Sequence, residues 1–216
     1  MNEEYTFRPY VGPKYGTEES VLMRRLLVLG ASHYGVDADN HDGNLTQVVI
    51  SHYLDPNRRV NRKTGELTWK PTHTRFYKAI IDDKCVGIDA VVKSVVFYNY
   101  LQEFEGIDAG DKHPEKFSQK EIKEKNEKCF EMLLREIKPE VIIVWGANVK
   151  SVFPWELFSI ESRKNCDKQF PAIYHCIFNG ECTIDIDVCF STHPSAPRFY
   201  RQRPKALFGA LKLFEV

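Results

Sequence analysis

Five apolar residues in a row end at a glycine in Val141-Ile142-Ile143-Val144-Trp145-Gly146. A short, unbroken apolar run that stops at a turn residue is typical of a strand buried on both faces, as parallel strands are. Comparable runs occupy residues 25–29, which lead into Gly30, and residues 91–98 and 187–192. The sequence therefore predicts four strands that lie in the middle of a sheet.

Helical patterns fill the segments between these runs. Residues 118–138 combine charged residues with apolar ones at helical spacing, and Ser118 with Glu121 matches a capping box at the start. Residues 45–53 and 74–81 predict two more helices. Because a helix between two strands suits a parallel crossover, we predict an α/β fold. In detail, we expect a three-layer α/β/α sandwich with a central, mostly parallel four-stranded sheet.

Two stretches interrupt this alternation. Residues 55–71 are basic and rich in turn residues, which fits an insertion. Residues 153–170 mix proline, tryptophan and charges and predict irregular structure. After them, residues 172–176 and 182–186 predict an added hairpin around Asn179-Gly180.

The composition fits a single domain over residues 1–216, because 43% hydrophobic residues in a chain of this length can build one large core. No apolar stretch of about 18 residues occurs, and residues 1–13 are polar. We therefore expect a cytoplasmic protein with neither a membrane span nor a secretory signal. The six cysteines include no C-x-x-C pair, which argues against a zinc ribbon or an iron–sulfur ligand set. Because the sequence shows no sign of export, we expect reduced thiols. We expect no metal and no cofactor. We also expect a monomer.

The charge is balanced, with 30 Lys and Arg against 30 Asp and Glu, so any binding of nucleic acid needs a local patch. Residues 58–63 form one basic cluster, which fits a solvated face. A second cluster comprises Arg198, Arg201, Arg203 and Lys205. Aromatic residues interleave this second cluster, which favours contact with nucleic acid.

Polar residues gather where the predicted strands end. The four segments are Gly30-Ala31-Ser32-His33-Tyr34-Gly35, Tyr98-Asn99-Tyr100, Gly146-Ala147-Asn148 and His193-Pro194-Ser195. Ligands of open α/β sheets bind outside the carboxyl ends of the strands. The sequence therefore predicts a site at this edge, with His193 placed to meet a ligand.

In this order and placement, the four segments resemble the motifs of the uracil-DNA glycosylase superfamily, over most of the chain from Leu26 to Tyr200. Residues 30–34 look like the Gly-rich loop of that family, and residues 97–100 like the strand that bears its base-binding asparagine. Residues 138–146 are similar to its structural Lys-Pro strand, and residues 193–195 match the His-Pro-Ser of its last loop. The resemblance implies a protein that binds a base flipped out of DNA.

The resemblance also implies a role for each residue. The base pocket would comprise Gly30, Ala31, His33, Tyr34 and Asn99. Asn99 would hydrogen-bond the N3–H and O4 of uracil, and His193 would stabilise the uracil anion as a neutral imidazole. Without the resemblance, Asn99 fits a strand-end residue that bonds its own backbone, His193 fits one bonded to a backbone carbonyl, and Tyr34 caps the core.

The loop after His193 would contact nucleic acid. Ser195 can bind a phosphate through its hydroxyl or backbone N–H. The resemblance places a wedge into the base stack here, for which Arg198, Phe199 and Tyr200 are the candidates. Alternatively, Arg198 pairs with a phosphate, and Phe199 and Tyr200 pack the loop onto the body of the protein.

Ser32 departs from the family pattern, which has Asp, Glu or Asn there to orient or activate the attacking water. A serine hydroxyl is a poor base without a partner, and a Ser32–His33 pair is only one hypothesis. Three functions stay open: a DNA glycosylase that acts on uracil or another deaminated or damaged base, a nucleobase- or nucleic-acid-binding module without cleavage, and a hydrolase of small nucleosides. The partner is accordingly DNA, a nucleobase or a nucleotide.

Overall fold

A computed structural model of the chain describes residues 5–33, 43–55, 70–82, 84–106, 113–164, 172–180, 183–197, 199 and 208–215. Within these ranges, seven strands form one mixed sheet in the order β1-β3-β2-β4-β7-β6-β5. The strands are β1 (Tyr10–Val11), β2 (Leu26–Gly30), β3 (Val95–Asn99), β4 (Val141–Trp145), β5 (Phe158–Lys164), β6 (Ile173–Asn179) and β7 (Thr183–Ser191). The fold is therefore α/β, as the sequence predicts.

The expectation of a mostly parallel four-stranded sheet is wrong. The four predicted strands do pair in parallel, as β3-β2-β4-β7. Antiparallel strands extend the sheet on both sides, however: β1 joins β3, and the β5–β6 pair joins β7. The β6–β7 ladder confirms the predicted hairpin, whose register pairs Asn179 with Thr183. The β5 strand occupies part of the stretch that the sequence predicts to be irregular.

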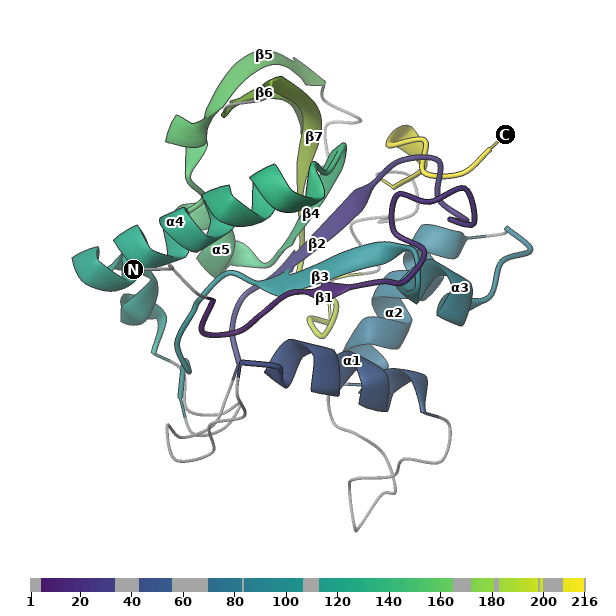
Figure 1. Cartoon of the computed structure of the whole chain (residues 1–216), viewed down its shortest axis with the longest axis horizontal. Helices are drawn as coiled ribbons and strands as arrows, with labels where there is room; N and C mark the ends of the chain where they lie inside the picture. The colour runs from purple at the N-terminus through teal and green to yellow at the C-terminus, as the bar shows by residue number, and fades with distance from the viewer. Residues whose placement is uncertain are drawn as a thin grey trace.

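Helices cover both faces of the sheet (Figure 1). On one face lie α1 (Leu45–Leu54), α2 (Lys70–Ile81) and α3 (Ile88–Val92); on the other lie α4 (Lys120–Ile137) and α5 (Ala147–Ser151). Two short 3-10 helices, η2 (Pro114–Ser118) and η3 (Trp155–Leu157), precede α4 and β5. The predicted capping box is absent, because Ser118 belongs to η2 and its hydroxyl donates to the carbonyl of Glu115.

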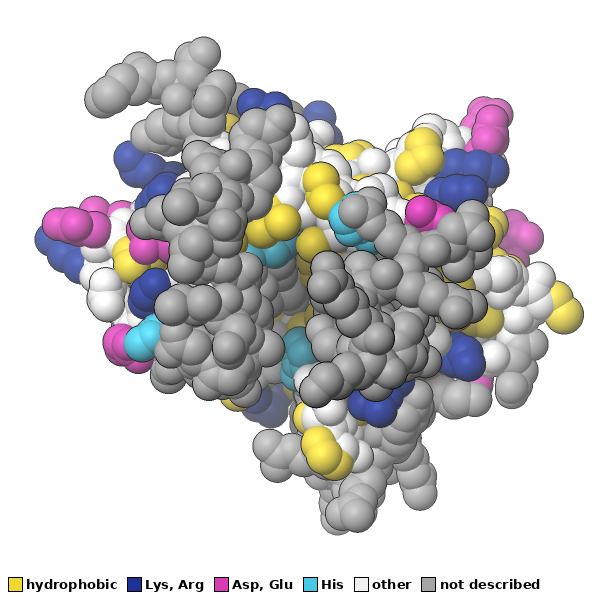
Figure 2. Space-filling model, turned by 90° about the horizontal axis from the view of Figure 1, so that it is seen from below, with side chains coloured by type: hydrophobic (Ala, Val, Ile, Leu, Met, Phe, Trp, Pro, Cys, Tyr) yellow, Lys and Arg dark blue, Asp and Glu magenta, His cyan; other side chains and the backbone are white. Residues whose placement is uncertain are grey.

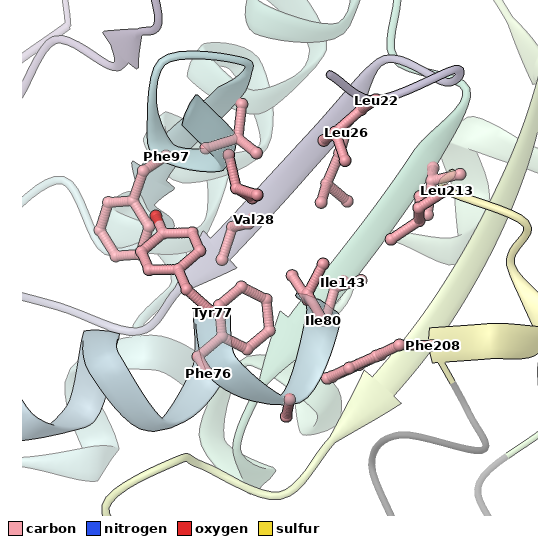
Figure 3. Packing of buried hydrophobic residues seen from close by; sticks show 14 of the residues in the cluster. Leu22, Leu26, Val28, Phe76, Tyr77, Ile80, Phe97, Ile143, Phe208 and Leu213 are labelled. Carbon is pink, nitrogen blue, oxygen red and sulfur yellow. The ribbon is translucent and has the colours of Figure 1, made fainter. Parts of the chain in front are cut away.

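Successive residues of the central strands face opposite cores, as the alternation of strand side chains requires. Val28 and Ile143 face the α2 side, whereas Leu27 and Ile142 belong to the core on the α4 side. Figure 3 shows Leu26, Val28 and Ile143 of the sheet against Phe76, Tyr77 and Ile80 of α2. One sheet therefore joins two cores, which explains why the central strands read as unbroken apolar runs.

Successive strands are added first on one side of β2 and then on its other side. From β2 the chain crosses the face covered by α1, α2 and α3 to reach β3, then crosses the opposite face through α4 to reach β4 on the other side of β2. In such a sheet the connections diverge at the carboxyl ends of the two neighbouring strands, here β2 and β4. This topological switch point is where an open α/β sheet binds its ligand.

No helix among the described residues is long and apolar enough to cross a membrane. Four of the cysteines fall within the described ranges, and none of these forms a disulfide: Cys85 is exposed, and Cys129, Cys176 and Cys189 are buried.

Candidate functional site

The switch point between β2 and β4 brings together residues that the sequence places far apart. Gly30 ends β2 beside Asn99 at the end of β3, and Gly146 follows β4. Gly146 adopts a φ of +84°, in the left-handed region that favours glycine, and its N–H donates to the carbonyl of Ser191 (2.9 Å). A side chain at Gly146 would lie 3.6 Å from Cβ of His193. The turn after β4 therefore holds the backbone close to His193.

Ser32 is hydrogen-bonded to an acidic residue that no sequence motif singles out. Its hydroxyl donates a hydrogen bond to Oε2 of Glu105, whose side chain is almost entirely buried. Glu105 is held there because its backbone N–H donates to the carbonyl of His33 (2.9 Å). The hypothesis of a Ser32–His33 pair thus has a competitor, because the Ser32 hydroxyl donates to a carboxylate.

His33 joins Asn99 and α1 in a buried hydrogen-bond chain. Nε2 of His33 lies 3.1 Å from Nδ2 of Asn99 and 2.9 Å from Oγ1 of Thr46. An amide nitrogen can only donate, so Nε2 of His33 accepts and carries no proton. The ring is braced by an edge contact with Phe7, at 4.8 Å between centroids. His33 therefore orients the amide of Asn99, and both side chains lie mostly out of solvent.

Gly30 leaves room for that amide. A Cβ on Gly30 would lie 2.2 Å from Oδ1 of Asn99 and 3.0 Å from the ring of Phe97. Real Cβ atoms do not approach oxygen so closely, so a larger residue at this position would force the Asn99 amide to move. The β2–β3 register, which pairs Gly30 with Asn99, brings this about.

The contacts of His193 fix its tautomer. The backbone N–H of Ser195 donates to Nδ1 of His193 (3.3 Å), and the Ser195 hydroxyl lies 2.7 Å from the same nitrogen. Because a backbone N–H cannot accept, Nδ1 is the acceptor and the neutral ring carries its proton on Nε2. His193 thus presents a donor at Nε2. The exposed Ser195 thus holds the ring of His193 in this tautomer.

Aromatic rings connect His193 with the region of Asn99. The rings of Trp145 and His193 meet edge to face, with their centroids 5.8 Å apart. The ring centroid of His73, on α2, lies 5.4 Å from that of Trp145 and 5.0 Å from that of Phe97. Burial lowers the pKa of His73 to about 3, and the nearby imidazole of His193 contributes to a smaller extent. His73 is therefore neutral at physiological pH. The indole N–H of Trp145 is buried and has no hydrogen-bond partner in the part of the chain that the structure describes.

The space-filling view from below shows histidine side chains near the middle of this side of the molecule (Figure 2). Strands β2 and β7 run toward this side in Figure 1. The face that carries the strand ends is thus also a face rich in imidazole.

The remaining predicted residues fall into three groups. Ala31 lies beside Ser32, and its carbonyl accepts from the N–H of Leu101 (2.9 Å). Phe199 is 1% exposed and belongs to the core on the α2 side, which favours packing over a wedge for this residue. Tyr34, Arg198 and Tyr200 lie outside the described residues, as do residues 58–63 and the rest of the second basic cluster.

Four residues of the site are absent from the sequence-based predictions: Thr46, His73, Glu105 and Trp145. Trp145 carried a signal, since it ends a predicted strand on the same edge as Gly30. Glu105 follows Asn99 by six residues in a segment with no distinctive pattern, and Thr46 and His73 lie on helices. Only the tertiary structure brings those three to the strand ends.

The sequence matches no protein-family model, and no curated protein matches it at a significant level. Among the described residues, no group of three or more His, Cys, Asp or Glu side chains is arranged to hold a metal ion. The arrangement itself offers three chemical elements: a carboxylate with a hydroxyl, an oriented amide, and an imidazole donor.

Proposed function

We propose that this chain is a DNA glycosylase-like protein of the uracil-DNA glycosylase type, with a three-layer α/β/α fold. It binds uracil, or another deaminated or damaged base, flipped out of DNA, and hydrolyses the N-glycosidic bond. In that reaction water adds to C1′ of the sugar, the bond from C1′ to the base nitrogen breaks, and its electron pair leaves with the base. A donor is needed at the base, and an acceptor for the proton of the water.

The observation that carries the proposal is the tautomer of His193. With Nδ1 engaged by Ser195, the ring carries its proton on Nε2, which suits a hydrogen bond to an oxygen of the departing base. A neutral imidazole can donate this hydrogen bond to the anionic base without carrying a positive charge of its own. His193 follows β7 and lies next to the turn at Gly146, which follows β4. This position supports contact with a ligand at the switch point.

Asn99 supports the recognition of a base. Its amide offers a donor and an acceptor side by side, as the adjacent N3–H and O4 of uracil require. The bond to His33 fixes which way the amide faces, and Gly30 keeps the space around Oδ1 open. A preorganised amide of this kind binds with less loss of side-chain freedom than a mobile one.

A single-turnover assay with excess enzyme tests the proposal. The substrates are labelled oligonucleotides that contain one uracil, hypoxanthine or xanthine, single-stranded or mismatched. We expect abasic sites with the natural protein, and a rate lowered by roughly 100-fold or more for His193→Ala, as for loss of one transition-state donor. Ser195→Ala should slow cleavage about fivefold, since the backbone N–H still orients the ring.

The outcomes separate the possible roles. If no substrate is cleaved, the glycosylase proposal fails. If His193→Ala cleaves as fast as the natural protein, the role given to His193 is wrong. If Ser195→Ala loses DNA affinity but keeps its rate at saturation, then Ser195 contacts a phosphate and does not orient His193.

One observation favours a second function, a nucleobase-binding module without cleavage. The amide nitrogen of Asn99 and the Ser32 hydroxyl both have partners within the protein, and Ser32 replaces the acid or amide of the family pattern. Under this alternative the same oligonucleotides bind in a fluorescence anisotropy assay, with uracil preferred over thymine, but none is cleaved.

A further inference from the structure

The segment that follows β3 continues alongside the loop that follows β2. The N–H groups of Tyr100 and Leu101 donate to the carbonyls of Gly30 (3.0 Å) and Ala31 (2.9 Å). His33 then forms a parallel bridge with Phe104. The two chains therefore run side by side past the edge of the sheet, and this pairing sets which side chains meet.

Glu105 reaches Ser32 because of this pairing. Its backbone N–H donates to the carbonyl of His33, and its side chain is 1% exposed. A carboxylate removed from water needs hydrogen-bond donors, and the Ser32 hydroxyl supplies one. The Nζ of Lys116 donates to the carbonyl of Phe104, the residue before Glu105 (2.6 Å).

The hydroxyl and the carboxylate differ in their access to solvent. Ser32 is partly exposed at the strand end, whereas Glu105 lies behind it. A molecule at the switch point can thus meet the hydroxyl, and the carboxylate acts on it only through that hydroxyl. A serine whose proton is held by a carboxylate is a much better proton acceptor than a serine alone.

We propose that Ser32 and Glu105 together activate the attacking water, so that Glu105 supplies from another segment the carboxylate that position 32 lacks. This inference rests on the glycosylase function proposed above. As the water oxygen bonds to C1′, its proton passes to Oγ of Ser32 and the Ser32 proton passes to Oε2 of Glu105. The electron pair of the broken bond leaves with the base, which His193 Nε2–H stabilises. Ser32 is the catalytic residue of the pair, and Glu105 is a positioning residue that acts through it.

Four variants test the pair in single-turnover cleavage of a single-stranded uracil oligonucleotide. Glu105→Gln keeps an acceptor for the Ser32 hydroxyl but cannot take up its proton. Ser32→Ala removes the group that contacts water. Ser32→Asp combined with Glu105→Gln moves the carboxylate to position 32 and leaves an amide donor beside it. The control is Glu103→Gln, two residues along the same segment and partly exposed.

We expect Glu105→Gln and Ser32→Ala each to lower the rate at saturating enzyme about 100-fold, while the Kd for the uracil oligonucleotide changes less than about threefold. The combined Ser32→Asp, Glu105→Gln variant should recover to within about tenfold of the natural rate. Glu103→Gln should cleave at the natural rate. Recovery by a moved carboxylate is a result that a merely structural role for Glu105 does not produce.

Several results would overturn the inference. One is cleavage by Glu105→Gln at the natural rate. Another is slow cleavage by Glu105→Gln together with equally slow cleavage by the combined variant, because Glu105 would then serve structure alone. If thermal unfolding shows that Glu105→Gln does not fold, Ser32→Ala and the combined variant decide. Absence of cleavage by the natural protein refutes the glycosylase function and this inference together, whereas cleavage that needs His193 but not Glu105 refutes the inference alone.

Discussion

At the scale of single residues, the direction of each hydrogen bond determines what the site can do. The backbone N–H of Ser195 donates to Nδ1 of His193, so the ring proton is on Nε2. The amide nitrogen of Asn99 donates to Nε2 of His33, and this bond orients the amide. The two imidazoles therefore act differently: His193 presents a donor, and His33 accepts within the protein. Both assignments follow from partners that can only donate, a backbone N–H and an amide nitrogen.

His73 makes the stability of the fold depend on pH. Burial lowers its pKa to about 3, whereas in the unfolded chain a histidine titrates near 6.5. The unfolded state alone therefore binds a proton at His73 as the pH falls from about 6.5 toward 3, and stability is lost over that window. From this residue alone, we expect the free energy of unfolding to be about 2 kcal/mol lower at pH 5 than at pH 7.5.

Denaturant unfolding at the two pH values measures this effect. His73→Phe, which keeps a ring among Tyr53, Phe97 and Trp145, should lose about 2 kcal/mol less than the natural protein on acidification. His52→Gln, a change at a partly buried histidine in the last turn of α1, should retain the full loss. An equal loss in His73→Phe and the natural protein would show that His73 is not the group that titrates.

At the scale of the elements, the central strands could be predicted because burial on both faces leaves an unbroken apolar run. The run at residues 91–98 nevertheless divides into α3 and β3, since its first two valines are buried on a helix and the strand begins at Val95. Strand β5 was not predicted because it lies at the edge of the sheet. All of its residues except Phe158 are exposed, and several are charged. Such a strand has the composition of a loop.

The register of β2 on β3 gives a test at the same scale. Gly30→Ala would place a Cβ 2.2 Å from Oδ1 of Asn99, so the amide must move. We expect a loss of about 1–3 kcal/mol in stability, as for overpacking, and about tenfold weaker binding of a uracil oligonucleotide. Gly87→Ala is the control, because among the described residues no heavy atom apart from its own chain neighbours lies within 4 Å of the new Cβ there. Denaturant unfolding and fluorescence anisotropy measure the two effects, and equal behaviour of the two variants would contradict the role given to Gly30.

At the scale of the whole molecule, the place of the site could be predicted but not its composition. The sequence puts Gly30, Asn99 and His193 at strand ends, and parallel strands end at one edge of a sheet. The order of the strands, and hence the position of the switch point, depends on crossovers that no local pattern encodes. Glu105 enters through a pairing beyond the sheet, and His73 through the packing of α2. Such contacts join residues of long sequence separation and leave no periodic signal.

The two cores should unfold as one unit, because β2 and β4 contribute alternate side chains to both. Neither core can lose its strands while the other remains folded. We therefore expect one cooperative unfolding transition, which tests the expectation of a single domain.

Trp145 reports on the core on the α2 side, and Trp155 packs against the core on the α4 side. With Trp69→Phe as background, Trp155→Phe leaves Trp145 as the only tryptophan, and Trp145→Phe leaves Trp155 as the only one. In guanidinium titrations of each variant, we expect the fluorescence midpoint to coincide with the far-UV circular dichroism midpoint. Separate midpoints in either variant would show that the faces of the sheet unfold independently.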